Sequence, residues 1–245
     1  MPHAEGAGVA LHYDERGDGP PLLVVHGMAS DAAAWASALD ELAAAGARAI
    51  AYDRRGYGSS GAPEPYAATT VQEQAQDAGA LLLALAAAPA LLVGEGFGAL
   101  VVLELLVRRP ELARAAVVVD PSLHAFVPEA TMALAVEREL LEQALREGGP
   151  AAAVKAWLGD GADPDRADRA AAAQLGFFAD YAGQASWSPS RRELRAIGVP
   201  VAVVTGPDTA PFVVVAAADA AAALLPDARR ARDGDVVAAA RALLA

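Results

Sequence analysis

An acid and a histidine, Asp120 and His124, stand four residues apart directly after an apolar run typical of a buried strand. A carboxylate and an imidazole at one strand end can serve as a general acid and base. The alternative is that His124 is only a polar residue where the next segment begins. Asp208 also follows a β-rich run, where it would be either a second proton-transfer carboxylate or a helix cap. We take Asp120, His124 and Asp208 as candidate catalytic residues.

Two glycine-containing turns follow other apolar runs. Gly94-Glu95-Gly96-Phe97-Gly98 comes after one run and precedes a helical pattern, and His26-Gly27-Met28 comes after another. Glycine permits tight turns and close approach of a ligand to the backbone. Glu95 would either point into a pocket or act as a carboxylate at a helix N-terminus, where the helix dipole favours it.

Composition excludes several classes of chemistry. The chain has no cysteine, which removes thiolate nucleophiles, disulfides and zinc–thiolate or iron–sulfur sites. A net charge of -12 disfavours nucleic acid as a partner. Residues 78–93, the most apolar stretch, are broken by Gly79 and Pro89 and fall short of the roughly 18 uninterrupted residues of a membrane span. We expect a cytoplasmic protein without a secretory signal, a metal site or a cofactor, and the sequence leaves the oligomeric state open.

Strand and helix patterns alternate along most of the 245 residues, which favours a doubly wound, mostly parallel α/β sheet. Residues 9–13 and 22–25 are predicted to form a hairpin that leads into the first buried strand. Between residues 122 and 189 the strand pattern gives way to helical patterns separated by glycines. We therefore predict a core formed by residues 1–121 and 190–245, with residues 122–189 inserted as a helical cap.

Aromatic side chains are concentrated in the predicted cap. Each is either ordinary core or part of a ligand pocket, and as a group they favour a small apolar or aromatic ligand. The acidic residues Glu137, Glu139, Glu142 and Glu147 are predicted to form the solvated face of a cap helix. The candidate pocket residues are His26, Glu95, Gly96, Phe126, Trp157, Phe177, Phe178, Tyr181 and Trp187.

The order of these elements and turns resembles the α/β-hydrolase superfamily over nearly the whole chain. The resemblance implies that the backbone N–H groups of Met28 and Phe97 form an oxyanion hole, and that Asp208 or Asp120 occupies the position of the catalytic acid. The sequence departs from the family where the nucleophilic serine is expected, because that residue is Gly96. It departs again at residues 232–236, where the family's histidine is absent.

Ordinary serine hydrolysis needs a nucleophile and a base within hydrogen-bond reach of each other. The sequence therefore favours a cofactor-free enzyme that carries out a cyclisation, elimination, isomerisation or decarboxylation on a small apolar carbonyl metabolite, with a role in biosynthesis. A protein that binds a small molecule without catalysis is the alternative. A further alternative is hydrolysis by an activated water without an acyl-enzyme.

Overall fold

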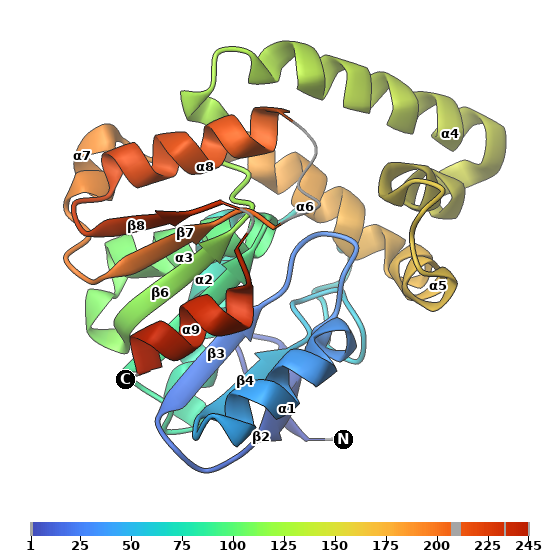
Figure 1. The fold of residues 1–245 in the computed structure, drawn as a ribbon. Helices are drawn as coiled ribbons and strands as arrows, with labels where there is room; N and C mark the ends of the chain where they lie inside the picture. Colours follow the sequence, from blue (N-terminus) through green and yellow to red (C-terminus); the bar gives the residue numbers. More distant parts are fainter. Residues whose placement is uncertain (1, 207–211, 233, 245) are drawn as a thin grey trace.

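The structure, a computed structural model, describes residues 2–206, 212–232 and 234–244. Within these ranges the strands form one sheet of eight strands in the order β1-β2-β4-β3-β5-β6-β7-β8 (Figure 1). The strands are β1 (His3–Glu5), β2 (Ala10–Arg16), β3 (Pro21–Val25), β4 (Arg48–Tyr52), β5 (Ala90–Glu95), β6 (Ala113–Val119), β7 (Val201–Val204) and β8 (Ala228–Ala231).

The sheet is mostly parallel, as predicted. From β4 to β8 all neighbouring strands are parallel, whereas β2 is antiparallel to both β1 and β4. The predicted hairpin between β2 and β3 is wrong, because β4 lies between them. The turn after β2 instead passes the start of β4, where the Arg48 N–H donates to the Pro20 carbonyl at 3.0 Å. This leaves β3 in the interior of the sheet, where parallel strands are buried on both faces.

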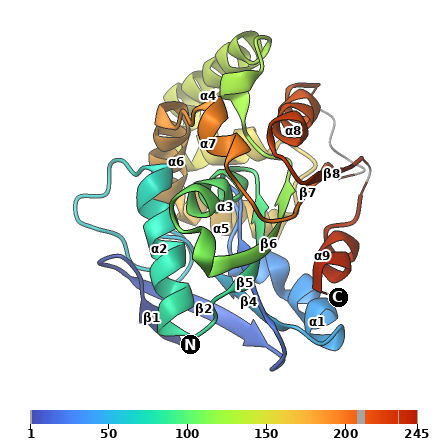
Figure 2. The same ribbon diagram turned by 90° about the vertical axis from the view of Figure 1, so that its left-hand side faces the viewer.

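Helices cover both faces of the sheet (Figure 2). On one face α1 (Ala36–Ala44) and α9 (Val236–Leu244) pack Leu39, Leu42 and Val237 against the strands. On the other face lie α2 (Val71–Ala84), α3 (Phe97–Arg108) and α8 (Phe212–Leu224), whose buried residues join the larger core cluster. Such two-sided cover, with parallel pairing, defines the doubly wound architecture.

The segment predicted to form the cap is helical where the structure describes it (Figure 1). After the short η3 (His124–Phe126) come α4 (Ala130–Leu158), α5 (Pro164–Ala172) and α6 (Gln174–Ser186), followed by the short α7 (Arg191–Arg195). Gly149, with a φ of 78°, breaks α4 just before Pro150. Proline lacks the N–H that continues a helix, which explains the break. The exact division into core and cap stays a prediction.

No helix in the described ranges is both long and apolar enough to cross a membrane.

Candidate functional site

The turn between β5 and α3 forms the floor of the candidate site. Gly96 caps α3 with φ 54° and ψ −113°, a conformation that side chains rarely adopt and glycine tolerates. Its N–H donates to the Val119 carbonyl at 2.9 Å, so the turn is held against the neighbouring strand β6. The strand-to-helix turn predicted at this position is therefore present.

The three glycines of this turn differ in the space available for a side chain. A Cβ atom at Gly94 would lie 2.5 Å from the Gly98 carbonyl oxygen, and one at Gly98 would lie 2.1 Å from the Val25 carbonyl oxygen. At Gly96 the nearest atoms, Gly27 Cα and Ser122 Oγ, would be 3.9 Å away. Backbone contact thus requires glycine at 94 and 98, whereas a side chain at 96 would have open space.

His26 holds the neighbouring loop in place from behind. Its Nδ1 lies 2.8 Å from the Gly27 carbonyl oxygen, and its Nε2 accepts the Arg54 N–H at 3.0 Å. Burial, together with the Arg54 charge, lowers the pKa of this imidazole well below its ordinary value. With both ring nitrogens engaged, His26 is buried and does not line the cavities described below, contrary to its prediction as a pocket residue.

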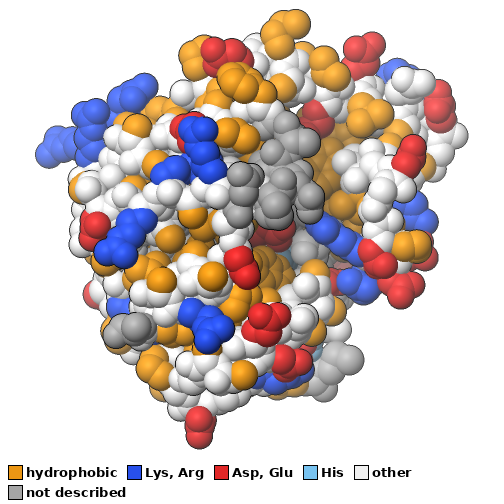
Figure 3. All heavy atoms as spheres, viewed as in Figure 1, with side chains coloured by type: hydrophobic (Ala, Val, Ile, Leu, Met, Phe, Trp, Pro, Cys, Tyr) orange, Lys and Arg blue, Asp and Glu red, His pale blue; other side chains and the backbone are white. Residues whose placement is uncertain are grey.

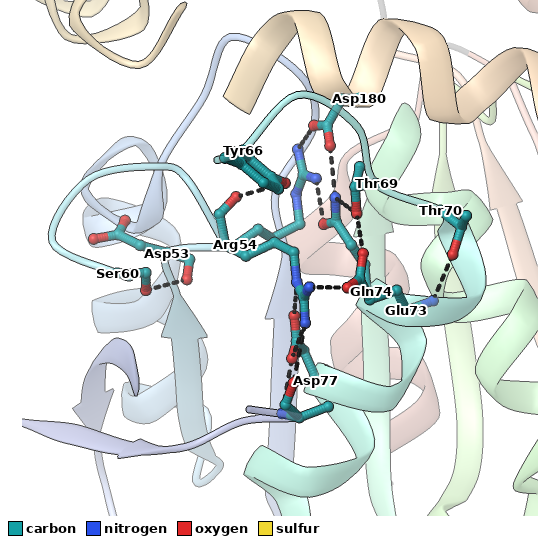
Figure 4. A network of polar contacts seen from close by, with 12 residues as sticks. Asp53, Arg54, Ser60, Tyr66, Thr69, Thr70, Glu73, Gln74, Asp77 and Asp180 are labelled. Atoms are coloured by element: carbon teal, nitrogen blue, oxygen red, sulfur yellow. Dashed lines mark hydrogen bonds and ion pairs between the residues drawn. The ribbon is translucent and has the colours of Figure 1, made fainter. Parts of the chain in front are cut away.

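Arg54 joins this loop to helix α6 (Figure 4). Its guanidinium donates to the His26 carbonyl at 2.9 Å and the Gly27 carbonyl at 3.0 Å, and it pairs with Asp180 at 2.7 Å. Gln74 bridges the same two residues, accepting from Arg54 and donating to Asp180, each at 2.6 Å. The network therefore connects the loop after β3 to the predicted cap, and the Arg54 and Asp180 side chains in it are fully buried.

A cavity of about 500 Å³ opens above Gly96. Figure 3 shows a hollow with hydrophobic side chains along its wall beneath α4. Its lining comes from the loop after β3, from the β5–α3 turn, from the segments after β6 and β7, from α4 to α6 and from the start of α8. The lining residues are Gly27, Met28, Glu95, Gly96, Phe97, Asp120, Ser122, His124, Ala133, Leu134, Glu137, Trp157, Arg166, Gln184, Gly206, Val213 and Val214.

A larger cavity of about 920 Å³ shares Ser122, His124, Leu134 and Gln184 with the first. It extends between α4 and α6 over a mostly apolar surface. The two cavities therefore adjoin. The carboxyl-bearing residues Glu95, Asp120 and Glu137 line the smaller one, whereas the larger one offers more apolar area.

The predicted cap aromatics divide between these cavities and the core. Trp157 lines the smaller cavity, and Phe178, Tyr181 and Trp187 line the larger one. Phe177 is fully buried, with its ring centroid 5.3 Å from those of both Trp157 and Phe178, so it supports the wall from behind.

Phe126 is not among the lining residues of either cavity, and its ring instead lies under the Arg191 guanidinium at 5.2 Å. Packing against a neighbouring cation thus explains its position outside the pocket.

Two of the three candidate proton-transfer residues lie at the same cavity. Asp120, with a φ of 45°, and His124 both line the smaller cavity. The His124 Nδ1 lies 3.4 Å from Gln184 Nε2, and burial lowers the pKa of the imidazole. Asp208 lies outside the described residues.

Met28 and Phe97, the predicted oxyanion donors, both line the smaller cavity. Among the hydrogen bonds of residues 2–206, 212–232 and 234–244, no protein acceptor is found for either N–H. The role of these two N–H groups as oxyanion donors stays a prediction.

Two glutamates face the smaller cavity from opposite sides. Glu95 lies on the floor, where burial raises the pKa of its carboxyl, while the Arg166 charge and a hydrogen bond from the Gly27 N–H lower it. Glu137 lies on α4, where burial likewise raises the pKa and hydrogen bonding to Trp157 and Tyr181 lowers it.

The prediction that Glu137 belongs to a solvated face is wrong, because its carboxyl is half-buried against the cavity. Its spacing from Leu134 and Leu141 puts it on their side of the helix, a signal that could have revealed its position. Arg166 lines the cavity as well, but no sequence pattern marks it.

Within the part of the chain that the structure describes, no group of three or more His, Asp or Glu side chains is arranged to hold a metal ion.

Residues 22–242 match the model of the alpha/beta hydrolase family, and the chain belongs to this family. The chain is similar to an epoxide hydrolase from Caballeronia sordidicola, with 41% identity over 92 residues. That match covers 38% of this chain and 28% of the relative, so the chain spans only part of it. It is also 32% identical over 242 residues to "Putative carbamate hydrolase RutD" from Variovorax paradoxus, covering 91% of this chain and 84% of the relative.

Solved structures share the fold over almost the whole chain. The enol-lactonase from Burkholderia xenovorans has a TM-score of 0.78 at 22% identity, with 99% of this chain and 98% of that chain covered. An alpha/beta hydrolase from Sphaerobacter thermophilus gives 0.77 at 22% identity and the same coverage. At this identity the likeness establishes the fold alone.

Proposed function

We propose that this protein is an enzyme that converts a small apolar carbonyl compound without forming a covalent intermediate. The observation that carries the proposal is the turn at Gly96, which keeps its strained geometry and open space but has no side chain to attack a substrate. Cyclisation, elimination, isomerisation and decarboxylation all proceed through enolate-like or alkoxide-like oxygens. Each can be accelerated by hydrogen-bond donors placed where that charge develops.

The proposed oxyanion donors are the N–H groups of Met28 and Phe97. Asp120, His124 and Asp208 are the proposed proton carriers, of which Asp120 and His124 line the same cavity as the donors. The proposal assigns no role to a cofactor. Removing one oxyanion donor from an enzyme typically costs about 3–4 kcal/mol of transition-state stabilisation, so two donors can support catalysis without a nucleophile.

Degeneration of the hydrolytic triad is part of this proposal. The sequence has Gly96 at the expected nucleophile and no histidine in residues 232–236. Since nucleophile and base act together, loss of both removes acyl transfer. The apolar wall of the larger cavity supports an apolar or aromatic substrate. A biosynthetic role would suit such a substrate.

The test incubates the protein with a panel of small apolar ketones, β-keto acids and β-hydroxy ketones and follows each by proton NMR. We expect at least one compound to change at a rate that depends on protein concentration. At least one of Asp120→Asn, His124→Ala and Asp208→Asn should lower that rate about 10²-fold or more, the scale for a general acid or base. Asp168→Asn, on an exposed side chain, is the control.

If compounds bind but are recovered unchanged, and the three variants bind them with native affinity, the protein is a non-catalytic binder and the enzymatic proposal fails.

A second candidate function is hydrolysis by a water activated on His124 or Asp208. It is favoured by the names of the relatives described above, which include "Epoxide hydrolase" and "Putative carbamate hydrolase RutD". Steady hydrolysis of a nitrophenyl ester or an aryl epoxide without an initial burst, lost in His124→Ala or Asp208→Asn, would support this candidate over the first.

A further inference from the structure

We propose that Glu95 joins the proton carriers of the smaller cavity, as the group that takes a proton from a substrate carbon and gives a proton back. This inference rests on the proposed function and adds to it a residue for which the sequence predicted only a place in the pocket. The geometry of the floor carries it. Glu95 is the last residue of β5, directly before Gly96, and its side chain lines the cavity.

The Glu95 carboxyl lies against the proposed oxyanion loop. The Gly27 N–H donates to it, and Oε2 lies 3.5 Å from the position that a Cβ atom of Gly27 would occupy. Gly27, which contacts the carboxyl, directly precedes the proposed donor Met28 in the sequence. Glu95 itself is two residues before the other proposed donor, Phe97. A carboxylate accepts at about four lone-pair positions, which leaves some free after the Gly27 hydrogen bond.

The open space above Gly96 is the natural place for the reacting carbon. A side chain at 96 would point between Gly27 and Ser122, and the carboxyl of Glu95 lies beside Gly27. Because Gly96 has no Cβ, a ligand can approach the turn more closely than it could in a protein with a nucleophile there. The missing side chain thus makes room for the substrate next to Glu95.

Several charges surround this carboxyl. Arg166 on α5 and Arg54 after β4 favour its ionised form, whereas Asp120 after β6 and burial favour its protonated form. The net effect raises the pKa of Glu95 above its ordinary value. A carboxylate whose conjugate acid has a raised pKa is a stronger base than an ordinary glutamate, which favours removal of a proton from carbon.

The chemical step balances without a co-reactant. The Glu95 carboxylate removes a proton from a carbon next to the substrate carbonyl, and the electrons of that C–H bond form an enolate. The N–H groups of Met28 and Phe97 stabilise the enolate oxygen. The carboxylic acid can exchange its proton with solvent and return a solvent-derived proton to the same carbon, which gives isotope exchange. It can instead return the proton to a conjugated carbon, which gives isomerisation. No bond to the protein forms.

The experiment follows deuterium uptake in D₂O by NMR at the benzylic carbon beside the carbonyl of 2-tetralone, a small ketone with a fused aromatic ring. The variant Glu95→Gln keeps the shape and an acceptor for the Gly27 N–H but cannot take the proton. Glu139→Gln on the exposed side of α4 makes the same chemical change away from both cavities. Glu95→Asp retains the carboxyl and serves as the conservative variant.

We expect native protein and Glu139→Gln to accelerate exchange equally, Glu95→Gln to lose about 10²-fold or more, and Glu95→Asp to recover part of the loss. The native rate should rise with pH as Glu95 ionises, and this rise should be absent in Glu95→Gln. Circular dichroism should show that the fold of each variant is unchanged. If Glu95→Gln does not fold, the exchange rate of Glu95→Asp and the pH dependence of the native rate test the role of Glu95 instead.

Native exchange that Glu95→Gln retains would overturn the role of Glu95 and leave the proposed function intact, with Asp120, His124 or Asp208 as the base. An absence of exchange by native protein with 2-tetralone and with every ketone of the panel would instead overturn the proposed function, and the role of Glu95 with it.

Discussion

The guanidinium of Arg54 and the carboxylate of Asp180 lie 2.7 Å apart with no solvent exposure of either side chain. Both residues are also held by other groups, since Tyr57 donates to Asp180 at 2.7 Å and Gln74 bridges the pair. The ion pair thus fixes α6 to the loop that carries the proposed oxyanion donor Met28. Removal of one partner would leave a buried charge uncompensated.

We predict that Asp180→Asn lowers the free energy of unfolding by about 3–5 kcal/mol, the usual effect of breaking a buried ion pair. Asp168→Asn is the matched control, because its partner Lys155 and Asp168 itself are half or more exposed, and exposed pairs contribute about 0–1 kcal/mol. Urea unfolding of the three proteins measures the difference. Equal losses in the two variants would show that the buried network does not stabilise the fold as we argue.

We predict that Gly96→Ser folds and that Gly98→Ser does not. The first introduces a side chain into open space at a strained φ, at a cost of about 1–3 kcal/mol. The second places a Cβ atom 2.1 Å from a backbone oxygen that cannot move aside. Circular dichroism and thermal unfolding of both variants test this, and a stable Gly98→Ser would contradict the geometry described for the turn.

Gly96→Ser should also have negligible activity on a nitrophenyl ester, because no histidine stands in residues 232–236 to activate the new hydroxyl. Stopped-flow absorbance would detect a burst of nitrophenol if an acyl-enzyme formed. Robust turnover with a burst would mean that another base, such as His124, already reaches this position.

Native protein should not be labelled by a fluorophosphonate probe for serine hydrolases, since Gly96 provides no hydroxyl at the turn. Intact-mass spectrometry after incubation measures labelling, with a known serine hydrolase as the positive control. One probe per protein molecule, at any residue, would refute the non-covalent proposal.

Stability should fall as the pH drops below about 6.5, partly because of His26. The pKa of this buried imidazole lies well below the ordinary value of about 6.5, so in this range the unfolded chain binds a proton that the folded chain does not. Stability from this group is therefore present above pH 6.5 and is lost as pH falls. A charged ring would also turn its Nε2 from an acceptor into a donor facing the Arg54 N–H.

The measurement compares native protein with His26→Gln by urea unfolding at several pH values. Native protein should lose stability relative to the variant as pH falls, by at most about 1.4 kcal/mol per pH unit. Because the raised pKa of Glu95 acts in the opposite direction and is present in both proteins, only the difference between them is diagnostic. Parallel pH profiles would contradict the role given to His26.

Local patterns predicted most of the fold. The alternation of strand and helix patterns predicts the parallel part of the sheet, and the glycines at 94 and 98 mark a turn that backbone contacts require. The place of β2 was missed because strand pairing is non-local, and a turn of suitable composition does not fix which strands become neighbours.

The site was harder to predict than the fold. Helical spacing indicates that Trp157, Phe177 and Phe178 are inward-facing, but it cannot tell a cavity wall from solid core, and Phe177 belongs to the core. Asp180 pairs with an arginine that is distant in sequence, so nothing near it signals burial. Glu137 was assigned to the solvated face because other acidic residues surround it in the sequence, although its helical spacing from Leu134 and Leu141 places it on their side of α4.

The anchoring of α6 also indicates where the substrate range of this protein can be re-engineered. One wall of the larger cavity belongs to the helix that carries Asp180, so redesign there risks the buried charge. The facing wall comes from the first half of α4, where Leu134, Ala135 and Leu141 line the cavity without taking part in that network. Libraries for new ligands should therefore vary α4 and keep α6 constant.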